Sequence, residues 1–312
     1  MRRVSSTSTS SISYLIRDVS ETCPADKDTK HRDRRDESIP AYPYNVSYRF
    51  TAMGKKAVLV ISFGTSYNDN RAETIVPMEQ AIASEFPDRE PRRAWTSRMI
   101  LAKLKKRDGE HIDYIDEAMD RLIAEGFDDV IVQPTHIMNG TEYDFVESIV
   151  SGYRDRIPVI AMGKPLLTSG EDFEEVVAAI ANDLVPLADG GALVLMGHGT
   201  EHFANSAYSE LQLRLFFAGY KDVYVTTVEG FPDFDNTLEL MRNKGYENVT
   251  VTPFMIVAGD HANNDMAGDD DDSLRSVLEK EGYSVKCVIK GLGSYPSFRR
   301  MFAEHAMKAE QI

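Results

Sequence analysis

The stretch VTVTPFMIVAGDHANNDMAGDDDD, residues 249–272, decides the fold class. Its apolar, β-branched run Val249–Val257 is typical of a strand buried on both faces, as in a parallel sheet. The run breaks at residues 258–260 and presents His261 directly afterwards. In an open α/β sheet, ligands bind outside the carboxyl ends of the strands. We therefore expect His261 at a binding edge, although a lone histidine after a strand is more often a surface or capping residue.

From Lys55 onward, short β-rich runs alternate with segments of helical periodicity, such as Ile112–Glu125 and Leu274–Glu281. This alternation predicts parallel sheets with helices on both faces and right-handed crossovers. The predicted strands are Ala57–Phe63, Arg92–Thr96, Asp129–Pro134, Pro158–Met162, Ala192–Met196, Asp222–Val228, Asn248–Phe254 and Ser284–Ile289.

The two halves of this pattern repeat. GFDDVIVQP at residues 126–134 matches GYENVTVTP at residues 245–253, with an offset of 119 residues. VISFGT at residues 60–65 also resembles LMGHGT at residues 195–200, a match that would carry little weight alone because parallel strands look alike. We predict an α/β protein of two similar Rossmann-like lobes, residues 54–185 and 186–312. Each lobe is expected to hold a four-stranded parallel sheet flanked by helices, with a cleft between the lobes.

Residues 1–53 differ from the rest of the chain. A Ser/Thr-rich start is followed by a mixed-charge tract without apolar periodicity. This composition predicts a disordered leader, or residues upstream of a natural start at Met53, that activity does not need. The apolar patch Tyr14–Ile16 is too short for a secretory signal. We expect a cytoplasmic protein.

Composition excludes several functions. The 312-residue chain has a formal net charge of −15, which argues against general binding to nucleic acids or anionic membranes. No apolar run reaches the length of a membrane span, so we expect no membrane insertion. Its two cysteines, Cys23 and Cys287, cannot form a disulfide framework or a cysteine-based metal site.

Three potential metal ligands follow three successive strands of the second half. They are His198, between two glycines, then Glu229, then His261. The spacings of 31 and 32 residues are one βα unit each, so the three side chains should line up along one sheet edge. Two imidazoles and a carboxylate, with open positions left over, suit a divalent first-row metal that exchanges a ligand. Extending the repeat places Glu142 opposite His261. His202 would add a ligand only if its stretch were helical, and we predict a loop.

Four motifs then reveal a family resemblance: ISFGTSY (61–67), MGHG (196–199), VEGFP (228–232) and VAGDHANNDMA (257–267). In this order they resemble the anaerobic sirohydrochlorin cobaltochelatases, and the resemblance runs from Lys55 to the end of the chain. That family belongs to the class II tetrapyrrole chelatases of the ferrochelatase-like superfamily. The resemblance implies a chelatase-like fold and a lyase that inserts Co²⁺ into a sirohydrochlorin-type tetrapyrrole for cobalamin biosynthesis.

The resemblance also implies roles for individual residues. His198, Glu229 and His261 would hold Co²⁺, which is a substrate, and no organic cofactor is expected. His198 and Glu142 would be catalytic, because a neutral imidazole accepts a proton at pH 7 and Glu142 could take or relay one. The candidate tetrapyrrole contacts are Phe63, Glu142 and Ala258.

The acidity of the chain conflicts with a substrate that carries several carboxylates. Binding would require backbone N–H groups and selected cations. The acidic run Asp269–Asp272 is expected to cap a helix that begins at Ser273 rather than to deliver metal. Cations near predicted strand ends, for each of which surface solvation is the more common role, are Arg92, Arg93, Arg98 and Lys164.

Other functions stay open. The same ligands would suit a sirohydrochlorin ferrochelatase that makes sirohaem. A non-catalytic tetrapyrrole or metal carrier would use the same cleft but needs no base, so His198 and Glu142 favour an enzyme. A two-lobed periplasmic-type binding protein would be expected to have an export signal, which the sequence does not suggest. A homo-oligomer is compatible with the sequence.

Overall fold

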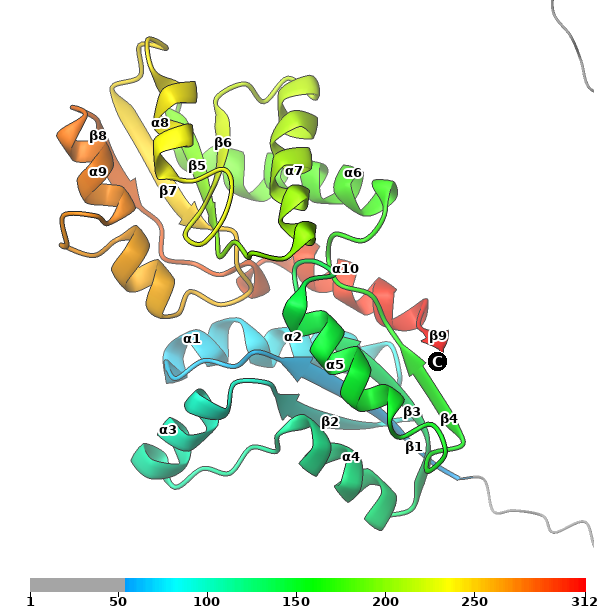
Figure 1. Ribbon diagram of the computed structural model, residues 1–312. Helices are drawn as coiled ribbons and strands as arrows, with labels where there is room; N and C mark the ends of the chain where they lie inside the picture. The colour runs from blue at the N-terminus through cyan, green and yellow to red at the C-terminus, as the bar shows by residue number, and fades with distance from the viewer. Residues whose placement is uncertain (1–53) are drawn as a thin grey trace, which may run out of the picture. The chain divides into compact units, whose positions relative to one another are not determined.

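The computed structural model describes residues 54–312, and the predicted leader lies outside the described residues. The described chain forms a five-stranded sheet of order β2-β1-β3-β4-β9 and a four-stranded sheet of order β6-β5-β7-β8 (Figure 1). All strand pairs are parallel except β4 and β9. The predicted α/β fold with two Rossmann-like sheets is confirmed, and all eight predicted strands are present.

The first half contains β1 (Lys55–Ser62), α1 (Asn68–Glu73), α2 (Ile75–Ser84), β2 (Glu90–Trp95), α3 (Arg98–Asp108), α4 (Ile115–Ala124), β3 (Phe127–Pro134), α5 (Thr141–Ser151), β4 (Val159–Met162) and α6 (Gly170–Ala179). The second half contains β5 (Ala192–Gly197), α7 (Ser206–Phe217), β6 (Val223–Thr227), α8 (Phe234–Met241), β7 (Asn248–Pro253), α9 (Leu274–Lys280), β8 (Ser284–Cys287), α10 (Pro296–Met307) and β9 (Glu310–Gln311). A π-helical turn, Ala262–Met266, lies between β7 and α9.

The strand register supports the internal repeat. Ile61 of β1 pairs with Pro134 at the end of β3, and Met196 of β5 pairs with Pro253 at the end of β7. These are the residues that the two sequence matches align with each other. The central pairs β1/β3 and β5/β7 therefore share one register, and the order β2-β1-β3-β4 repeats as β6-β5-β7-β8.

The apolar runs are explained by burial on both faces of the strands. Alternate residues of β1 belong to different cores: Ala57, Leu59 and Ile61 face one cluster, and Val58 and Val60 face another. Residues of β5 alternate in the same way, and its Leu193 and Leu195 join the cluster that contains Val58 and Val60. One hydrophobic core therefore takes side chains from both sheets.

The end of the chain returns to the first lobe, which the sequence did not predict. β9 pairs antiparallel with β4, as the fifth strand beside the four predicted parallel ones. α10 packs against α2 and β3, and its Phe298, Met301 and Phe302 are buried in the core that both sheets share (Figure 1). The predicted second lobe, residues 186–312, does not account for this return. Among the described helices, none has the length and hydrophobicity to cross a membrane.

Candidate functional site

A cavity of about 650 Å³ lies where the carboxyl ends of strands from both halves meet. Its walls are formed by residues that follow β1, β3, β5, β6 and β7, together with two residues of α3. This is the position at which parallel sheets bind ligands. Five of the predicted site residues line this one cavity: Phe63, Glu142, His198, Glu229 and His261.

Two histidines form the centre of the site. The rings of His198, after β5, and His261, after β7, meet edge to face with centroids 4.5 Å apart. The Nδ1 atom of His198 lies 2.8 Å from the carbonyl oxygen of Gly199. Because a carbonyl only accepts hydrogen bonds, Nδ1 must carry the proton, which leaves the Nε2 lone pair of His198 available to a metal or a proton.

Asp265 orients the second histidine. One of its carboxylate oxygens lies 2.8 Å from Nδ1 of His261, across one turn of the π-helical segment. This contact fixes the proton on Nδ1 and presents Nε2, which is the usual support for a histidine that binds a metal. Sequence reasoning missed Asp265, although a carboxylate four residues after a histidine in a helical turn is a readable signal.

A glycine allows the loops of His198 and Glu229 to approach each other. Gly199 has a φ of +82°, and a Cβ at this position would lie 2.7 Å from the backbone carbonyl carbon of Glu229. The N–H of Glu229 donates to the carbonyl oxygen of His198. Oε2 of Glu229 lies 3.9 Å from Nδ1 of His198, so the carboxylate is adjacent to the two rings.

The three predicted metal ligands are neighbours, but their ligand atoms are not all close together. In the described chain, three ligand-type side chains bring their ligand atoms within 4.8 Å of one another at His111, Asp113 and Glu117, but not at His198, Glu229 and His261. The first group is used structurally, because Asp113 accepts two hydrogen bonds from Arg121 and Glu117 accepts from the N–H of Tyr114 at the start of α4. The wider spacing at the cavity suits an ion that must leave again.

The opposite wall of the cavity comes from the first half of the chain. Phe63 follows β1 at the position that His198 takes after β5, and its side chain is 46% exposed. Glu142 is the second residue of α5 and lies at the position that His261 takes after β7. The repeat therefore places two histidines on one side of the cavity and, at the equivalent positions on the other side, an aromatic ring and a carboxylate.

Ala258 has a different place from the other predicted tetrapyrrole contacts. It is 2% exposed, and its N–H donates to Oδ1 of Asn70, which joins the two halves of the chain. It lines an adjoining pocket rather than the main cavity. Next to it, the hydroxyl of Tyr67 donates to Asp260 at 2.8 Å, and this hydrogen bond, followed by burial, raises the pKa of Tyr67.

Comparison with known proteins identifies the family. Residues 56–311 match the model of the cobalt chelatase family, CbiK. The chain is 39% identical over 255 residues to a sirohydrochlorin cobaltochelatase of Salmonella typhimurium, covering 82% of this chain and 96% of that protein. It is 31% identical over 263 residues to the sirohydrochlorin cobaltochelatase CbiKC of Nitratidesulfovibrio vulgaris, covering 82% of this chain and 91% of the relative.

The chain belongs to the cobalt chelatase (CbiK) family. The resemblance inferred from the four motifs is therefore confirmed. Among solved structures, SirB from Bacillus subtilis with Fe³⁺ is similar, with a TM-score of 0.56 and 15% identity over 81% of this chain and 95% of SirB. At that identity the similarity establishes the shared fold.

In this cobalt chelatase family member, His136 also lines the cavity. Part of the residue is accessible, but both ring nitrogens are buried and neither has a hydrogen-bond partner among the described residues. Burial lowers the pKa of His136 to about 4, so the ring is neutral near pH 7. No role was predicted for His136.

Other residues considered from the sequence do not line the main cavity. The segment from His198 to His202 is a loop rather than a helix, as predicted. Nε2 of His202 lies 3.5 Å from a carboxylate oxygen of Asp144 in α5. In the acidic run, Asp269 and Asp271 pair with Arg275 and Lys280, and Ser273 caps α9. The predicted cations are paired: Arg92 with Glu90 and Glu125, Arg93 with Glu79, Arg98 with Asp116, and Lys164 with Glu310.

Proposed function

We propose that this protein is a sirohydrochlorin cobaltochelatase, which inserts Co²⁺ into a sirohydrochlorin-type tetrapyrrole in anaerobic cobalamin biosynthesis. The observation that carries the proposal is the pair His198 and His261, each with Nε2 available, in the wall of a cavity large enough for a macrocycle. The two curated relatives, both named sirohydrochlorin cobaltochelatase, support the same substrate.

We assign the metal to His198, Glu229 and His261. Two neutral imidazole nitrogens and one carboxylate match the preference of divalent cobalt for nitrogen and oxygen ligands. The carboxylate offsets part of the ionic charge. Three protein ligands leave positions for water and for the incoming pyrrole nitrogens, so the ion stays transferable.

The macrocycle would lie against the apolar part of the cavity. Phe63, Met99 and Ile137 line it, and the first two are exposed apolar side chains. Burying such side chains against a flat, largely apolar ring is favourable, at roughly 25 cal/mol for each Å² removed from water. This contact holds the ring plane while its polar side arms remain near the rim.

Metal insertion displaces two pyrrole protons as Co²⁺ enters the ring. Nε2 of His198 is a neutral acceptor close to the metal position, and Glu142 offers a carboxylate from the other side of the cavity. We assign proton acceptance to these two residues. General base groups of this kind typically contribute about 10²–10⁴-fold in rate.

The deciding experiment is anaerobic incubation of the purified protein with sirohydrochlorin and Co²⁺, Fe²⁺ or Ni²⁺, followed by absorbance. The expected result is fastest formation of the cobalt product, with no product from a His198→Ala, His261→Ala double variant. Faster insertion of Fe²⁺ would make the protein a ferrochelatase. Tight tetrapyrrole binding without metal insertion or proton release would make it a carrier. A cytoplasmic location and a homo-oligomeric state remain predictions, and sedimentation measures the latter.

A further inference from the structure

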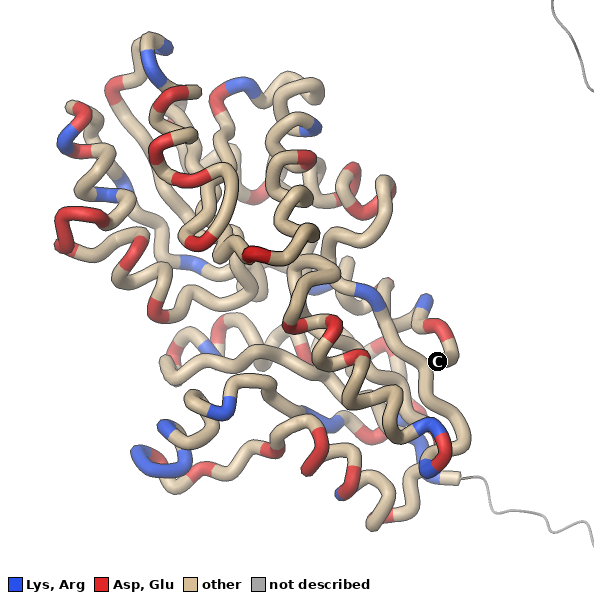
Figure 2. The backbone as a smooth tube through the Cα atoms, in the orientation of Figure 1, with Lys and Arg blue, Asp and Glu red and all other residues tan. Residues whose placement is uncertain are grey.

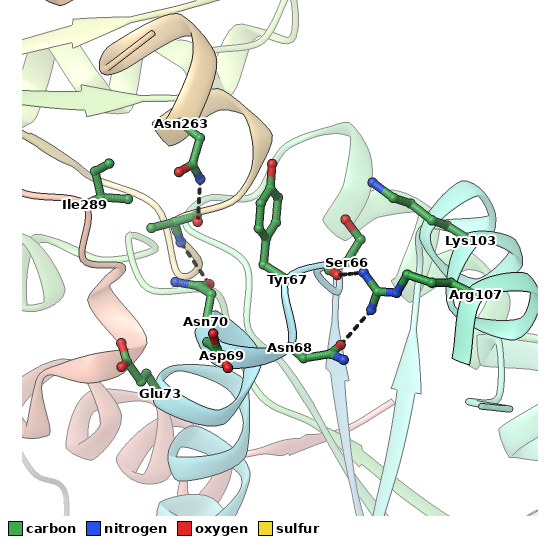
Figure 3. Close-up of a pocket in the computed structure, with 11 residues that line it drawn as sticks. Ser66, Tyr67, Asn68, Asp69, Asn70, Glu73, Lys103, Arg107, Asn263 and Ile289 are labelled. Atoms are coloured by element: carbon green, nitrogen blue, oxygen red, sulfur yellow. Dashed lines mark hydrogen bonds between the residues drawn. The ribbon is translucent and has the colours of Figure 1, made fainter. Parts of the chain in front are cut away.

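A second pocket of about 480 Å³ adjoins the metal-binding cavity (Figure 3). The two share Ser66 and Tyr67, so they meet at the segment that follows β1. α3 contributes Lys103 and Arg107, which lie one helical turn apart on the same face. Ala258 and Asn263 contribute from the other half of the chain.

The two pockets differ in charge. Among the described residues that line the main cavity, there is no lysine or arginine, and carboxylates are present at Glu142, Glu201, Glu229 and Asp260. A tetrapyrrole whose side arms are carboxylates therefore meets no cationic side chain in the cavity wall itself. The adjoining pocket supplies two, and Figure 2 shows the concentration of basic residues on α3.

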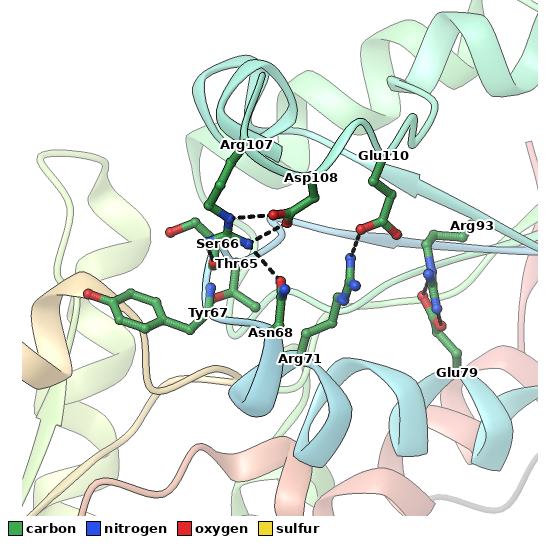
Figure 4. A network of polar contacts seen from close by, with 10 residues as sticks. All are labelled: Thr65, Ser66, Tyr67, Asn68, Arg71, Glu79, Arg93, Arg107, Asp108 and Glu110. Atoms are coloured by element: carbon green, nitrogen blue, oxygen red, sulfur yellow. Dashed lines mark hydrogen bonds and ion pairs between the residues drawn. The ribbon is translucent and has the colours of Figure 1, made fainter. Parts of the chain in front are cut away.

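The guanidinium of Arg107 is already hydrogen-bonded within the protein. Its guanidinium donates to the carbonyl oxygen of Ser66 at 2.7 Å, to Oδ1 of Asn68 at 2.8 Å, and to both carboxylate oxygens of Asp108 (Figure 4). It therefore fixes the loop between the two pockets, and Asp108 balances its charge. Arg71 and Arg93 in the same network pair with Glu110 and Glu79 (Figure 4).

Lys103 differs from these arginines. Within residues 54–312, its ammonium has no hydrogen bond or ion pair, and its side chain extends toward the Ser66 and Tyr67 side of the pocket (Figure 3). The hydroxyl of Ser66 also has no partner in the described chain, and it lies on that side. The pocket's own carboxylates, Asp69 and Glu73, belong to α1 and lie on the opposite side in Figure 3.

We propose that this pocket binds a carboxylate side arm of the tetrapyrrole, with Lys103 as the cation that holds it. The inference rests on the function proposed above. With the ring in the main cavity against Phe63, a side arm would enter the second pocket past Ser66 and Tyr67, which line both pockets, and would meet the ammonium of Lys103 there. The Ser66 hydroxyl would donate a second hydrogen bond, and Arg107 would position the loop without contacting the substrate.

The test compares two lysines of one helix. Lys103→Met and Lys105→Met remove the same charge from α3, but Lys105 is exposed and lines neither pocket. We expect Lys103→Met to raise the KM for sirohydrochlorin on the order of 10-fold, as loss of a charge-assisted hydrogen bond does. The effect should fall on KM rather than kcat. Lys105→Met should match the wild-type protein, and Lys103→Arg should restore most of the affinity.

Binding measurements separate this proposal from the function on which it rests. Quenching of protein fluorescence by metal-free sirohydrochlorin should weaken in Lys103→Met, whereas Co²⁺ titration without tetrapyrrole should not change. If the wild-type protein is active and both methionine variants shift KM equally, the effect is the general field of the protein and the carboxylate site is refuted. An unchanged KM in Lys103→Met refutes it as well. If the wild-type protein neither binds nor metallates sirohydrochlorin, the proposed function fails and the site with it.

Discussion

The imidazole rings of His198 and His261 stand edge to face, with centroids 4.5 Å apart, at the ends of the neighbouring strands β5 and β7. Each ring is held by a hydrogen bond at Nδ1, one to a backbone carbonyl and one to a carboxylate. The two histidines are therefore fixed in the tautomer that offers Nε2. In the proposed site this arrangement would bring two nitrogen ligands to one ion, without any thiolate that would bind it too tightly for transfer.

The two histidines should be indispensable for metal binding. We expect His198→Ala and His261→Ala each to weaken Co²⁺ binding by more than the roughly 100-fold that loss of a ligand's supporting hydrogen bond costs. Water cannot restore the geometry of a lost imidazole. Co²⁺ titration without tetrapyrrole and single-turnover insertion measure the two effects. His111→Ala, an exposed histidine of the first half, is the control, and full activity of either site variant would refute the site.

Asp265 should act through His261. Asp265→Ala removes the acceptor for Nδ1–H, so we expect Co²⁺ affinity to fall about 10–100-fold. Asp265→Asn keeps an oxygen acceptor and should lose less. The control is Asp271→Ala, which removes an exposed carboxylate that pairs with Lys280 and with no other residue of 54–312. Equal Co²⁺ affinities for Asp265→Ala and the control would show that the hydrogen bond has no role in metal binding.

Gly199 should be required for the approach of two ligand loops. In Gly199→Ala the backbone φ is positive and the new Cβ would lie 2.7 Å from the backbone carbonyl carbon of Glu229. In Gly219→Ala the φ is also positive, at +98°, but the new Cβ would have no atom within 4 Å. Left-handed backbone alone costs about 1–3 kcal/mol for a residue other than glycine. We expect both variants to lose unfolding free energy in that range, and Gly199→Ala to lose more and to bind Co²⁺ weakly. Denaturant unfolding and Co²⁺ titration compare them, and indistinguishable variants would contradict the steric argument.

Sequence patterns predicted the parts of the fold that local physics determines. Apolar runs predicted the central strands β1, β3, β5 and β7, because strands buried on both faces must be apolar almost throughout. The partly exposed edge strands β2 and β8 were predicted from the alternation of strands and helices. The positions of His198, Glu229 and His261 followed, because carboxyl ends of parallel strands share one edge. Placing Glu142 required only the internal repeat.

What the sequence did not predict depends on contacts between distant segments. The sequence of α10 indicates an amphipathic helix with one buried face. It does not indicate that this helix packs against α2 and β3 of the first half. Ion pairs are also set by the packing of different elements. Arg92 and Arg93 pair with glutamates, whereas Lys103 has no such partner in residues 54–312. The lining of the adjoining pocket by Lys103 and Ala258 likewise follows from tertiary packing.

His136 should make folding sensitive to acid. Its pKa is about 4 in the folded protein and about 6.5 in an unfolded chain. Below pH 6.5 the unfolded chain therefore binds a proton that the folded protein does not, and stability falls as the pH drops from 6.5 toward 4. The full loss of unfolding free energy from this histidine is about 3 kcal/mol. Denaturant unfolding at several pH values should show a flatter profile for His136→Leu, and parallel profiles would exclude this histidine as the cause.

Glu142 should separate proton transfer from metal binding. Glu142→Gln keeps the shape of the side chain and removes its basicity, on a wall of the cavity contributed by the first half of the chain. We expect Co²⁺ affinity without tetrapyrrole to stay near the wild-type value and single-turnover insertion to slow by about 10²–10⁴-fold. Glu147→Gln on the same helix is the control, because Glu147 is exposed and does not line the cavity. A loss of Co²⁺ affinity equal to that of His261→Ala would instead make Glu142 a metal ligand, and unchanged insertion would remove it from the mechanism.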